Sequence, residues 1–330
     1  MTVAITGGSG HLGNVVCRQL VEGGHHVKAL ARLDTLALLD LELDGHIELV
    51  EGDLLSPSSL DELCKETDIL IHCAAKISID GDPDGSVHRI NVDGVRNVMK
   101  AARKAGVKKV IHVSSTHAVQ ELPRNEPMTE DRPRKVKGAP AYDFSKASGE
   151  LVVLEEVSNG SIEACIVRPS SIVGPFDFKP SKLATALLDF RNRKVPMLPA
   201  GGYNFVDVRG VAQAVVTAIE KGESGEVYFL TGTYHTIREV AQTVSKVTGV
   251  KTPSTALPYW FLMTVLPFVR LYAKIRKAAP VFTKESIKTL KTGHPNIDNS
   301  KAKQILHLKT RPLEVSIKDF YTWYDEHGTV

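Results

Sequence analysis

The segment Val3-Ala4-Ile5-Thr6-Gly7-Gly8-Ser9-Gly10-His11-Leu12-Gly13 decides the fold of this chain. A strand-like apolar run leads into a glycine-rich turn, and an amphipathic stretch reaching Glu22 follows. Glycine allows a tight turn and a close backbone approach to a pyrophosphate, which the N–H groups and dipole of a helix N-terminus attract. Strand, turn and helix in this order predict a phosphate cradle made by Gly7, Gly10, His11, Leu12 and Gly13. The first two glycines stand one residue further apart than in G-x-G-x-x-G, and a structural turn without a ligand is the alternative.

The N-terminal half continues the rhythm that this segment begins. Strand-like runs occupy residues 3–6, 27–31, 47–50, 69–72, 110–113 and 164–167, and amphipathic segments occupy 12–22, 87–105 and 142–157. Alternation of this kind is typical of a parallel sheet covered on both faces. We therefore predict an α/β fold, a Rossmann-type doubly wound parallel sheet of six or seven strands.

The rhythm loosens after Arg168-Pro169, where prolines recur. Two further strand-like runs, Tyr203 to Val208 and Glu226 to Leu230, flank a helix from Val211 to Lys221. We expect both runs to rejoin the sheet region. The sequence then predicts a dinucleotide-binding domain of residues 1–170 plus 203–232, and a smaller, discontinuous C-terminal substrate domain of residues 171–202 plus 233–330.

Composition excludes several classes of protein. The chain has 330 residues, 42% hydrophobic and 24% charged, as in an ordinary globular protein. A net charge of +3 with mixed signs gives no reason to expect a nucleic-acid partner. Its four cysteines have no C-x-x-C spacing and lie in apolar runs, which favours buried free thiols and predicts no metal site. No signal peptide precedes the first strand, so we expect a cytoplasmic protein.

The segment Ala256 to Val269 carries no charge, and Arg270, Lys274, Arg276 and Lys277 follow it. It is shorter than the roughly 20 apolar residues that span a bilayer. One interpretation is a buried helix or a wall of the substrate pocket. The other is peripheral membrane contact through residues 256–277, with the basic side chains on lipid headgroups.

The residue after the second strand bears on the choice of cofactor. NAD-binding folds usually place an acid at the end of this strand to bind the adenosine ribose, but here the strand ends Leu30-Ala31-Arg32, so that Ala31 fills the acid position and Arg32 follows it. A guanidinium suits a 2′-phosphate, so Arg32 favours NADP(H) over NAD(H). A surface arginine without this role is the alternative, and Asp34 is a second candidate ribose ligand.

Seven motifs in order resemble those of one family, the extended short-chain dehydrogenase/reductases. They cover residues 1 to about 235 and comprise the glycine turn, Gly52-Asp53-Leu54-Leu55, His72-Cys73-Ala74-Ala75, Asn91-Val92-Asp93-Gly94, Val113-Ser114-Ser115, Tyr142-x-x-x-Lys146 and Arg168-Pro169-Ser170. Within this family, which forms part of the NAD-dependent epimerase/dehydratase superfamily, the chain looks most like the dihydroflavonol 4-reductase-like and 3β-hydroxysteroid dehydrogenase-like reductases.

The resemblance implies a set of cofactor contacts. Asp53 and Leu54 would contact the adenine, and Ala74 would lie along the dinucleotide. Three further residues, Val113, Pro169 and Ser170, would border the nicotinamide. Lys76 is another candidate for the cofactor site and for the pocket wall. Asn91 is expected to support the sheet and the cofactor region.

Tyr142 and Lys146 share one face of a predicted helix, and Ser115 follows a strand whose carboxyl end faces the ligand crevice. Tyr142 would give a proton to a carbonyl oxygen, or take one from an alcohol, and the Lys146 ammonium would lower its pKa. Lys146 would also hold the nicotinamide ribose. Alignment on the family pattern gives Ser115 the role of polarising the substrate oxygen. Ser114 and Thr116 remain alternatives.

Thr116, His117, Phe176 and Tyr203 are candidate substrate contacts, with Ile77 and Phe205 as further wall residues, and His117 could also relay a proton. The apolar stretch from Pro258 to Phe268 favours an apolar or aromatic carbonyl substrate, so we predict an NADP-dependent oxidoreductase that reduces a ketone or aldehyde, or runs the reverse reaction. A nucleotide-sugar epimerase or dehydratase using NAD is the first alternative, since Arg191, Arg193, Lys194 and Arg209 could bind a diphosphate. A non-catalytic dinucleotide sensor is the second. A homodimer through the helices at 87–105 and 142–157 is expected from the resemblance.

Overall fold

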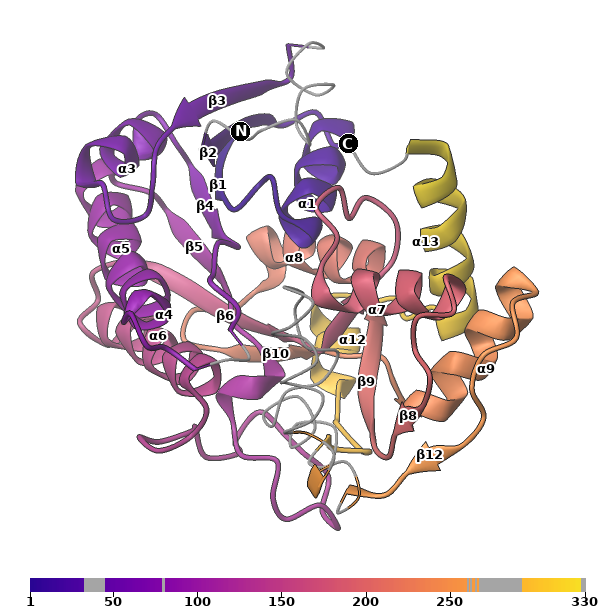
Figure 1. The fold of residues 1–330 in the computed structure, drawn as a ribbon. Coiled ribbons are helices and arrows are strands. Elements are labelled where there is room, and N and C mark those ends of the chain that lie inside the picture. Colours follow the sequence, from indigo (N-terminus) through magenta and orange to yellow (C-terminus); the bar gives the residue numbers. More distant parts are fainter. Residues whose placement is uncertain are drawn as a thin grey trace.

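The computed structural model describes residues 1–32, 45–78, 81–259, 261, 263, 264, 266 and 293–327. A seven-stranded sheet in the order β10-β6-β5-β4-β1-β2-β3 forms its centre (Figure 1), and every neighbouring pair is parallel. The strands are β1 (Thr2–Thr6), β2 (His26–Ala31), β3 (Ile47–Glu51), β4 (Ile69–His72), β5 (Lys109–Val113), β6 (Glu163–Pro169) and β10 (Val227–Leu230). The strand order reverses between β1 and β4, which is where ligands bind in such sheets. The predicted Rossmann-type fold is confirmed.

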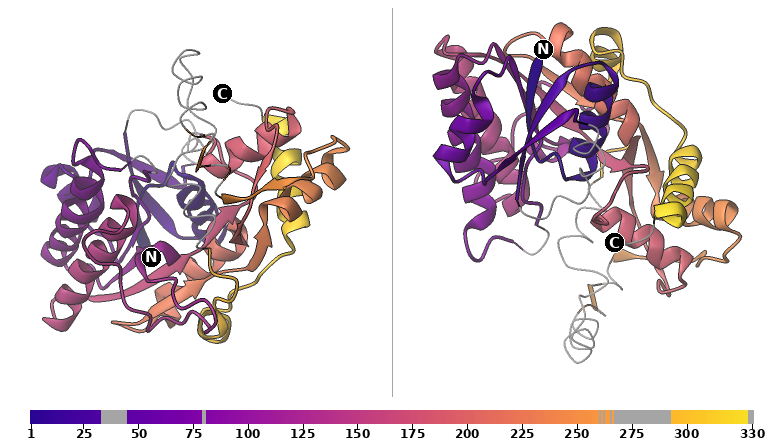
Figure 2. Two further views of the ribbon diagram at one scale, coloured as in Figure 1. Left: turned by 60° about the horizontal axis from the view of Figure 1, so that its bottom comes forward. Right: turned by 90° about the horizontal axis from the view of Figure 1, so that it is seen from above.

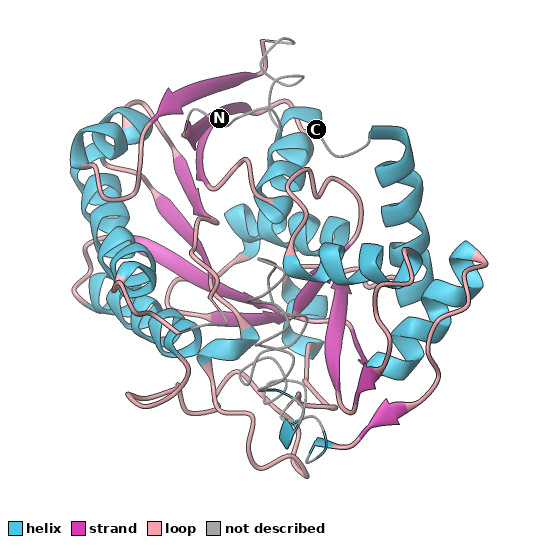
Figure 3. Ribbon diagram, in the orientation of Figure 1, coloured by secondary structure: helices cyan, strands magenta, loops and turns pink. Residues whose placement is uncertain are grey.

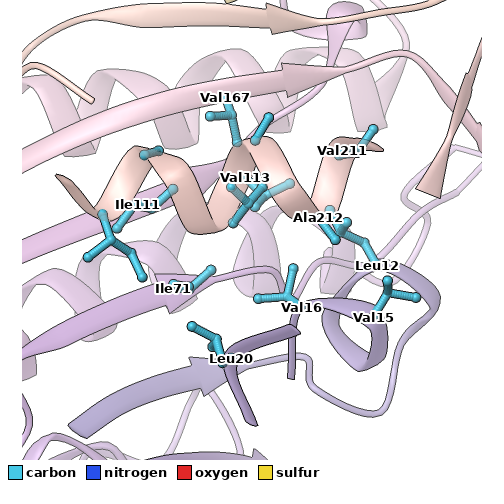
Figure 4. Close-up of a cluster of buried hydrophobic side chains, with 14 of the residues drawn as sticks. Leu12, Val15, Val16, Leu20, Ile71, Ile111, Val113, Val167, Val211 and Ala212 are labelled. Atoms are coloured by element: carbon cyan, nitrogen blue, oxygen red, sulfur yellow. The ribbon is translucent and has the colours of Figure 1, made fainter. Parts of the chain in front are cut away.

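Helices cover both faces of this sheet. On one face, α1 (His11–Glu22) and α8 (Val208–Lys221) pack together over an apolar core that includes Val16 and Ile111 (Figure 4). The other face carries a second core, under α3 (Pro57–Cys64), α5 (Gly94–Ala105) and α6 (Ala141–Ser158). Short helices precede α5 and α6: α4 (Ser86–His88), the π-helix η2 (Arg89–Asp93) and the 3-10 helix η3 (Thr116–Ala118). Because both faces are buried, the central strands read as nearly continuous apolar runs.

The C-terminal elements form a second layer beside the α1 and α8 face (Figures 2 and 3). A three-stranded sheet in the order β11-β9-β7 and a small pair, β12 with β8, provide its strands. Its elements are β7 (Ser171–Val173), α7 (Lys182–Arg191), β8 (Leu198–Pro199), β9 (Gly202–Asp207), β11 (Thr233–Thr236), α9 (Ile237–Thr248), β12 (Ala256–Leu257) and α13 (Leu313–His327). The helix α12 (Ser300–Ile305) packs instead against β10 of the central sheet, and its Ala302 joins the core under α1 and α8. A third apolar core holds α7, α9 and α13 together.

The structure corrects two expectations about the chain's path. The run at 226–230 rejoins the central sheet as β10, but the run at 203–208 does not: β9 pairs with β7 and β11 instead. The predicted helix at 87–105 contains the π-helix η2. The division into two domains with the stated boundaries stays a prediction.

Most of the predicted membrane-contact segment, 256–277, lies outside the described residues. Of its described part, Leu266 is buried against Leu257, Tyr259 and Met263. No helix within the described ranges is long and apolar enough to cross a membrane.

All four cysteines are free thiols. Burial of Cys17, Cys64 and Cys165 confirms the prediction, whereas Cys73, directly after β4, is only partly buried.

Candidate active site

The glycine turn lies at the carboxyl end of β1 and leaves no room for a side chain at Gly7 or Gly13. Gly7 has a φ of +76°, and a Cβ added there would lie 2.7 Å from the backbone nitrogen of Ala74. A Cβ on Gly13 would lie 2.0 Å from the carbonyl oxygen of Gly7. Within the described residues no side chain caps α1 at Gly10, so its first N–H groups can bind an anion. This cradle fits the diphosphate of a dinucleotide.

The other predicted cofactor residues surround the turn at the ends of β2, β3 and β4. Arg32 is exposed directly after β2, while Asp34 lies outside the described residues. Asp53 is exposed, and its side chain accepts a hydrogen bond from the Leu55 amide at 2.8 Å. Leu54 is buried, and Ala74 donates its N–H to Thr6 at 3.3 Å. The structure thus brings an exposed guanidinium and an exposed carboxylate to the same edge of the sheet as the glycine turn.

Lys76 turns its side chain to the start of α4. Its ammonium bonds the Ser86 hydroxyl and lies 3.8 Å from Asp84. Its backbone N–H donates to Asn91 at 2.7 Å.

Tyr142, Lys146 and Ser115 come together as predicted. Tyr142 and Lys146 stand in the first two turns of α6, and Ser115 follows β5. The Ser115 oxygen accepts the His117 amide N–H at 3.1 Å, which leaves its own proton free to be donated to another oxygen. The Lys146 ammonium donates to the Val113 carbonyl at 2.7 Å.

The three candidate hydroxyls after β5 point to different partners. Ser114 is buried and donates to Glu150 at 2.6 Å, so its side chain belongs to the interior. Thr116 lines a neighbouring cavity. Of the three, Ser115 is the one whose side chain lowers the pKa of Tyr142 in the described structure, which supports it as the serine of the site.

Burial controls the pKa values of Tyr142 and Lys146. It raises the pKa of Tyr142 to about 12, although the Ser115 hydrogen bond acts in the opposite direction. Burial also lowers the pKa of Lys146 to about 8, against the charge of Glu150, which raises it. The prediction that Lys146 lowers the pKa of Tyr142 is wrong for this structure. Its ammonium is directed to the Val113 carbonyl, and desolvation of the phenolate dominates.

Asn91 supports the site from η2, as predicted. Its amide nitrogen donates to the Lys76 carbonyl and to the Ser145 hydroxyl, both at 2.9 Å. A Cβ on Gly149 would lie 2.7 Å from the Asn91 carbonyl, so α6 packs closely on the π-helix. A π-helical turn here is consistent with the frequent use of such turns near functional sites.

A buried ion network beside the α6 helix was not predicted. Glu150 is fully buried and accepts hydrogen bonds from Arg168 at 2.7 and 2.8 Å and from Arg134 at 2.7 Å. Arg168, also fully buried, donates a further bond to the Glu130 carbonyl at 3.0 Å. The sequence signal was available, because Glu150 follows Lys146 by four residues and therefore lies on the same helix face.

Two buried histidines also escaped prediction. His72 and His112 pair in register at the ends of β4 and β5, and their rings stack 5.3 Å apart. Burial lowers the pKa of His72 to about 3 and that of His112 well below its usual value, and the Lys146 charge adds to both shifts.

A cavity of about 190 Å³ adjoins the candidate catalytic residues, because Thr116 and Asp143, which follow Ser115 and Tyr142 in the chain, line it. Predicted site residues on its wall are Thr116, His117, Ser170 and Tyr203. Its other lining residues are Val119, Glu121, Met128, Lys135, Ala139, Pro140, Asp143, Ser171, Asn204, Gly293, His294 and Ile297. Pro169 ends β6 beside this wall, and the Ser170 hydroxyl is 2.8 Å from the Asn204 side-chain oxygen.

A model of the NAD dependent epimerase/dehydratase family matches residues 3–230. The chain belongs to this family. It is 32% identical to sterol demethylase protein B of Methylococcus capsulatus, with 100% of both chains covered. It is 29% identical to a putative dihydroflavonol 4-reductase of Synechocystis sp., which covers 99% of this chain and 95% of that one. The crystal structure of gox2253 matches with a TM-score of 0.85 at 31% identity, covering 100% of this chain and 99% of that one.

These relatives confirm the resemblance read from the motifs. The chain is an extended short-chain dehydrogenase/reductase with dihydroflavonol reductase-like relatives, and its family binds a nicotinamide dinucleotide. The residues that match the family model include the glycine turn, Ser115, Tyr142, Lys146 and β10.

Phe176 does not line the cavity of this family member. It stands next to Pro175, whose carbonyl oxygen is 2.9 Å from His11 Nε2 in the glycine turn. The Arg18 guanidinium lies 4.6 Å from its ring centroid, and Trp323 packs at 5.9 Å. Phe176 therefore joins the glycine turn to the second layer, and its predicted contact with substrate is not supported by this position. Lys76, Ile77 and Phe205 are likewise absent from the described lining.

Three of the four cations suggested for a sugar diphosphate have acidic neighbours, and the fourth, Arg193, does not line the described cavity. Arg191 pairs with Asp325 at 2.6 Å and Lys194 lies 3.9 Å from Asp189. Arg209 pairs with both Asp207 and Asp319 at 2.7 Å. None of these three lines the described cavity, so the geometry gives the nucleotide-sugar alternative no support.

Proposed function

We propose that the chain is an NADP-dependent reductase of a ketone or aldehyde in an apolar or aromatic small molecule, or an alcohol dehydrogenase in the reverse direction. The observation that carries the proposal is the grouping of Ser115, Tyr142 and Lys146 beside the cavity: Ser115 follows β5, its side chain acts on the pKa of Tyr142, and Lys146 lies one turn further along α6.

A bound nicotinamide dinucleotide would supply the hydride for reduction or accept it for oxidation. As the carbonyl carbon receives the hydride, Tyr142 gives its hydroxyl proton to the carbonyl oxygen. A pKa of about 12 keeps this hydroxyl protonated at neutral pH, which suits the direction of reduction. Ser115 donates to the same oxygen and polarises the carbonyl. Lys146, still mostly charged at neutral pH with a pKa of about 8, would hold the ribose hydroxyls.

Arg32 supports NADP(H) as the cofactor. It is exposed at the point where an acid would bind the adenosine ribose, and Ala31 before it is buried. A guanidinium there can bind a 2′-phosphate through two charge-assisted hydrogen bonds.

Titration of the purified protein with NADPH and with NADH, followed by nicotinamide fluorescence, tests this assignment. Arg32→Ala should weaken NADPH binding by about 10- to 100-fold, the loss expected for bonds of roughly 1.5–3 kcal/mol, and should change NADH binding little. Arg238→Ala, at an exposed position on α9, is the matched control. Tighter binding of NADH, or NAD retained through purification, would overturn the NADP assignment and favour an epimerase.

A carbonyl screen then tests the reaction itself. Tyr142→Phe removes the phenolic hydroxyl that donates the proton and keeps the ring, so it should lower kcat by about 10²- to 10⁴-fold while cofactor binding persists. Equal turnover by Tyr142→Phe and the unaltered enzyme would remove the basis of the mechanism.

A further inference from the structure

His117 and Asp143 form a charged pair on the cavity wall that the proposed reaction does not use. His117 lies in η3 directly after the catalytic strand, and Asp143 follows Tyr142 in α6. The two side chains meet with His117 Nδ1 3.2 Å from Asp143 Oδ1. The imidazole also stands edge-on to the Tyr142 ring, with centroids 6.1 Å apart.

The charges around His117 favour its protonated form. Burial lowers its pKa, but the hydrogen bond and charge of Asp143, together with the charge of Glu121, outweigh burial and raise the pKa above its usual value. Lys135 acts against them, but it is already bonded to Glu121. The groups that face the ring are thus Asp143 and Tyr142 from α6, and Glu121 and Lys135 from the segment between η3 and α6.

Protonation changes what the ring offers to a ligand. With Nδ1 directed at Asp143, the neutral ring keeps a lone pair on Nε2 and can only accept a hydrogen bond there. The imidazolium carries a proton on Nε2 and becomes a positively charged donor. A group on the wall beside Tyr142 that is charged near neutral pH can therefore bind a negatively charged oxygen of the molecule whose carbonyl Tyr142 protonates.

We propose that His117, held by Asp143, binds a carboxylate that lies next to the reacting carbonyl, so that the substrate is an oxo acid with an apolar or aromatic body. This inference rests on the proposed reductase function for the identity of the reacting group. The lining supports it: Val119, Met128 and Ile297 provide apolar surface, and Lys135 is neutralised by Glu121. His117 is then a residue that sets specificity, and Asp143 positions it.

Three probes that differ at one group test the proposal: benzoylformate, its methyl ester and acetophenone. Their binding to the enzyme saturated with its preferred oxidised nicotinamide cofactor is measured by calorimetry at about pH 6 and about pH 9, on either side of the range in which a histidine with a raised pKa loses its proton. Benzoylformate should bind about tenfold or more tightly than either neutral probe at the lower pH. That advantage should shrink at the higher pH.

His117→Gln should abolish the advantage, and His88→Gln, at an exposed position on α4, should preserve it. Asp143→Asn should move the pH at which the advantage is lost to a lower value, which a purely structural role for Asp143 would not do. Equal binding of the acid and its ester, or an advantage that survives in His117→Gln, overturns the proposal.

Turnover of the same probes with the reduced cofactor separates this inference from the function on which it rests. Selective binding of benzoylformate without reduction of any probe would contradict the reductase function and leave the carboxylate site standing. Reduction of acetophenone as efficiently as benzoylformate would support the reductase and refute the carboxylate site.

Discussion

Replacement of Glu150 by glutamine should both destabilise the protein and change its activity profile. Glu150→Gln keeps the shape of the side chain but removes the charge that compensates Arg168, a guanidinium with no exposed surface. Three hydrogen bonds from guanidinium groups and one from Ser114 converge on this carboxylate. Leaving a buried charge without its partner costs about 3–5 kcal/mol, which corresponds to a loss of roughly 4–7 °C in the thermal midpoint of a chain of this size.

The same carboxylate raises the pKa of Lys146. Its neutralisation should therefore lower that pKa further, and the alkaline limit of activity should move to a lower pH. Glu163→Gln, an exposed carboxylate at the start of β6, is the control and should change stability by no more than about 0.5 kcal/mol. Thermal unfolding and a kcat/KM profile against pH measure the two effects. If the two variants unfold at the same temperature, the charge of Glu150 does not stabilise the fold.

Three further outcomes follow from the site. Gly13→Ala should abolish cofactor binding in a fluorescence titration while the circular dichroism spectrum persists, because its Cβ would lie 2.0 Å from the Gly7 carbonyl oxygen; undiminished affinity would show that the turn does not hold the cofactor. Ser115→Ala should lower kcat by about 10²-fold or more, whereas Ser114→Ala should mainly lower the thermal midpoint; the reverse pattern would exchange their roles. His112 stays neutral when folded but binds a proton below about pH 6.5 when unfolded, so it removes stability as pH falls from there. His112→Phe should flatten the stability curve by about 1.4 kcal/mol per pH unit in that range in denaturant unfolding at several pH values, and an unchanged slope would contradict a buried neutral imidazole.

The parts of the fold that the sequence predicted well are those in which local pattern and burial agree. The runs at 69–72 and 110–113 are apolar because both faces of the sheet are covered, and their lengths match β4 and β5 closely. Glycines at 7 and 13 have no alternative because backbone atoms occupy the places of their side chains. Tyr142 and Lys146 could be recognised because helix periodicity places them on one face.

The features that escaped prediction depend on contacts between distant segments. The run at 203–208 has the pattern of a buried strand, but nothing local tells β7 from β6 as its neighbour. Phe176 looked like a pocket residue, yet Arg18 and Trp323 hold it elsewhere. The pKa of Tyr142 follows from desolvation, which a sequence does not report. Dimerisation through α5 and α6 stays a prediction, to be tested by light scattering.

The position of β9 has a consequence for engineering this scaffold by recombination. After β6 the chain leaves the central sheet for β7, α7 and β9, returns to it with α8 and β10, and leaves again with β11. A single recombination point between two genes would therefore divide both layers, and each layer would contain segments from both parents. Exchanging the catalytic half of one enzyme with the recognition half of another needs several junctions at once, so point substitutions on the cavity wall offer a shorter route to a new substrate than recombination does.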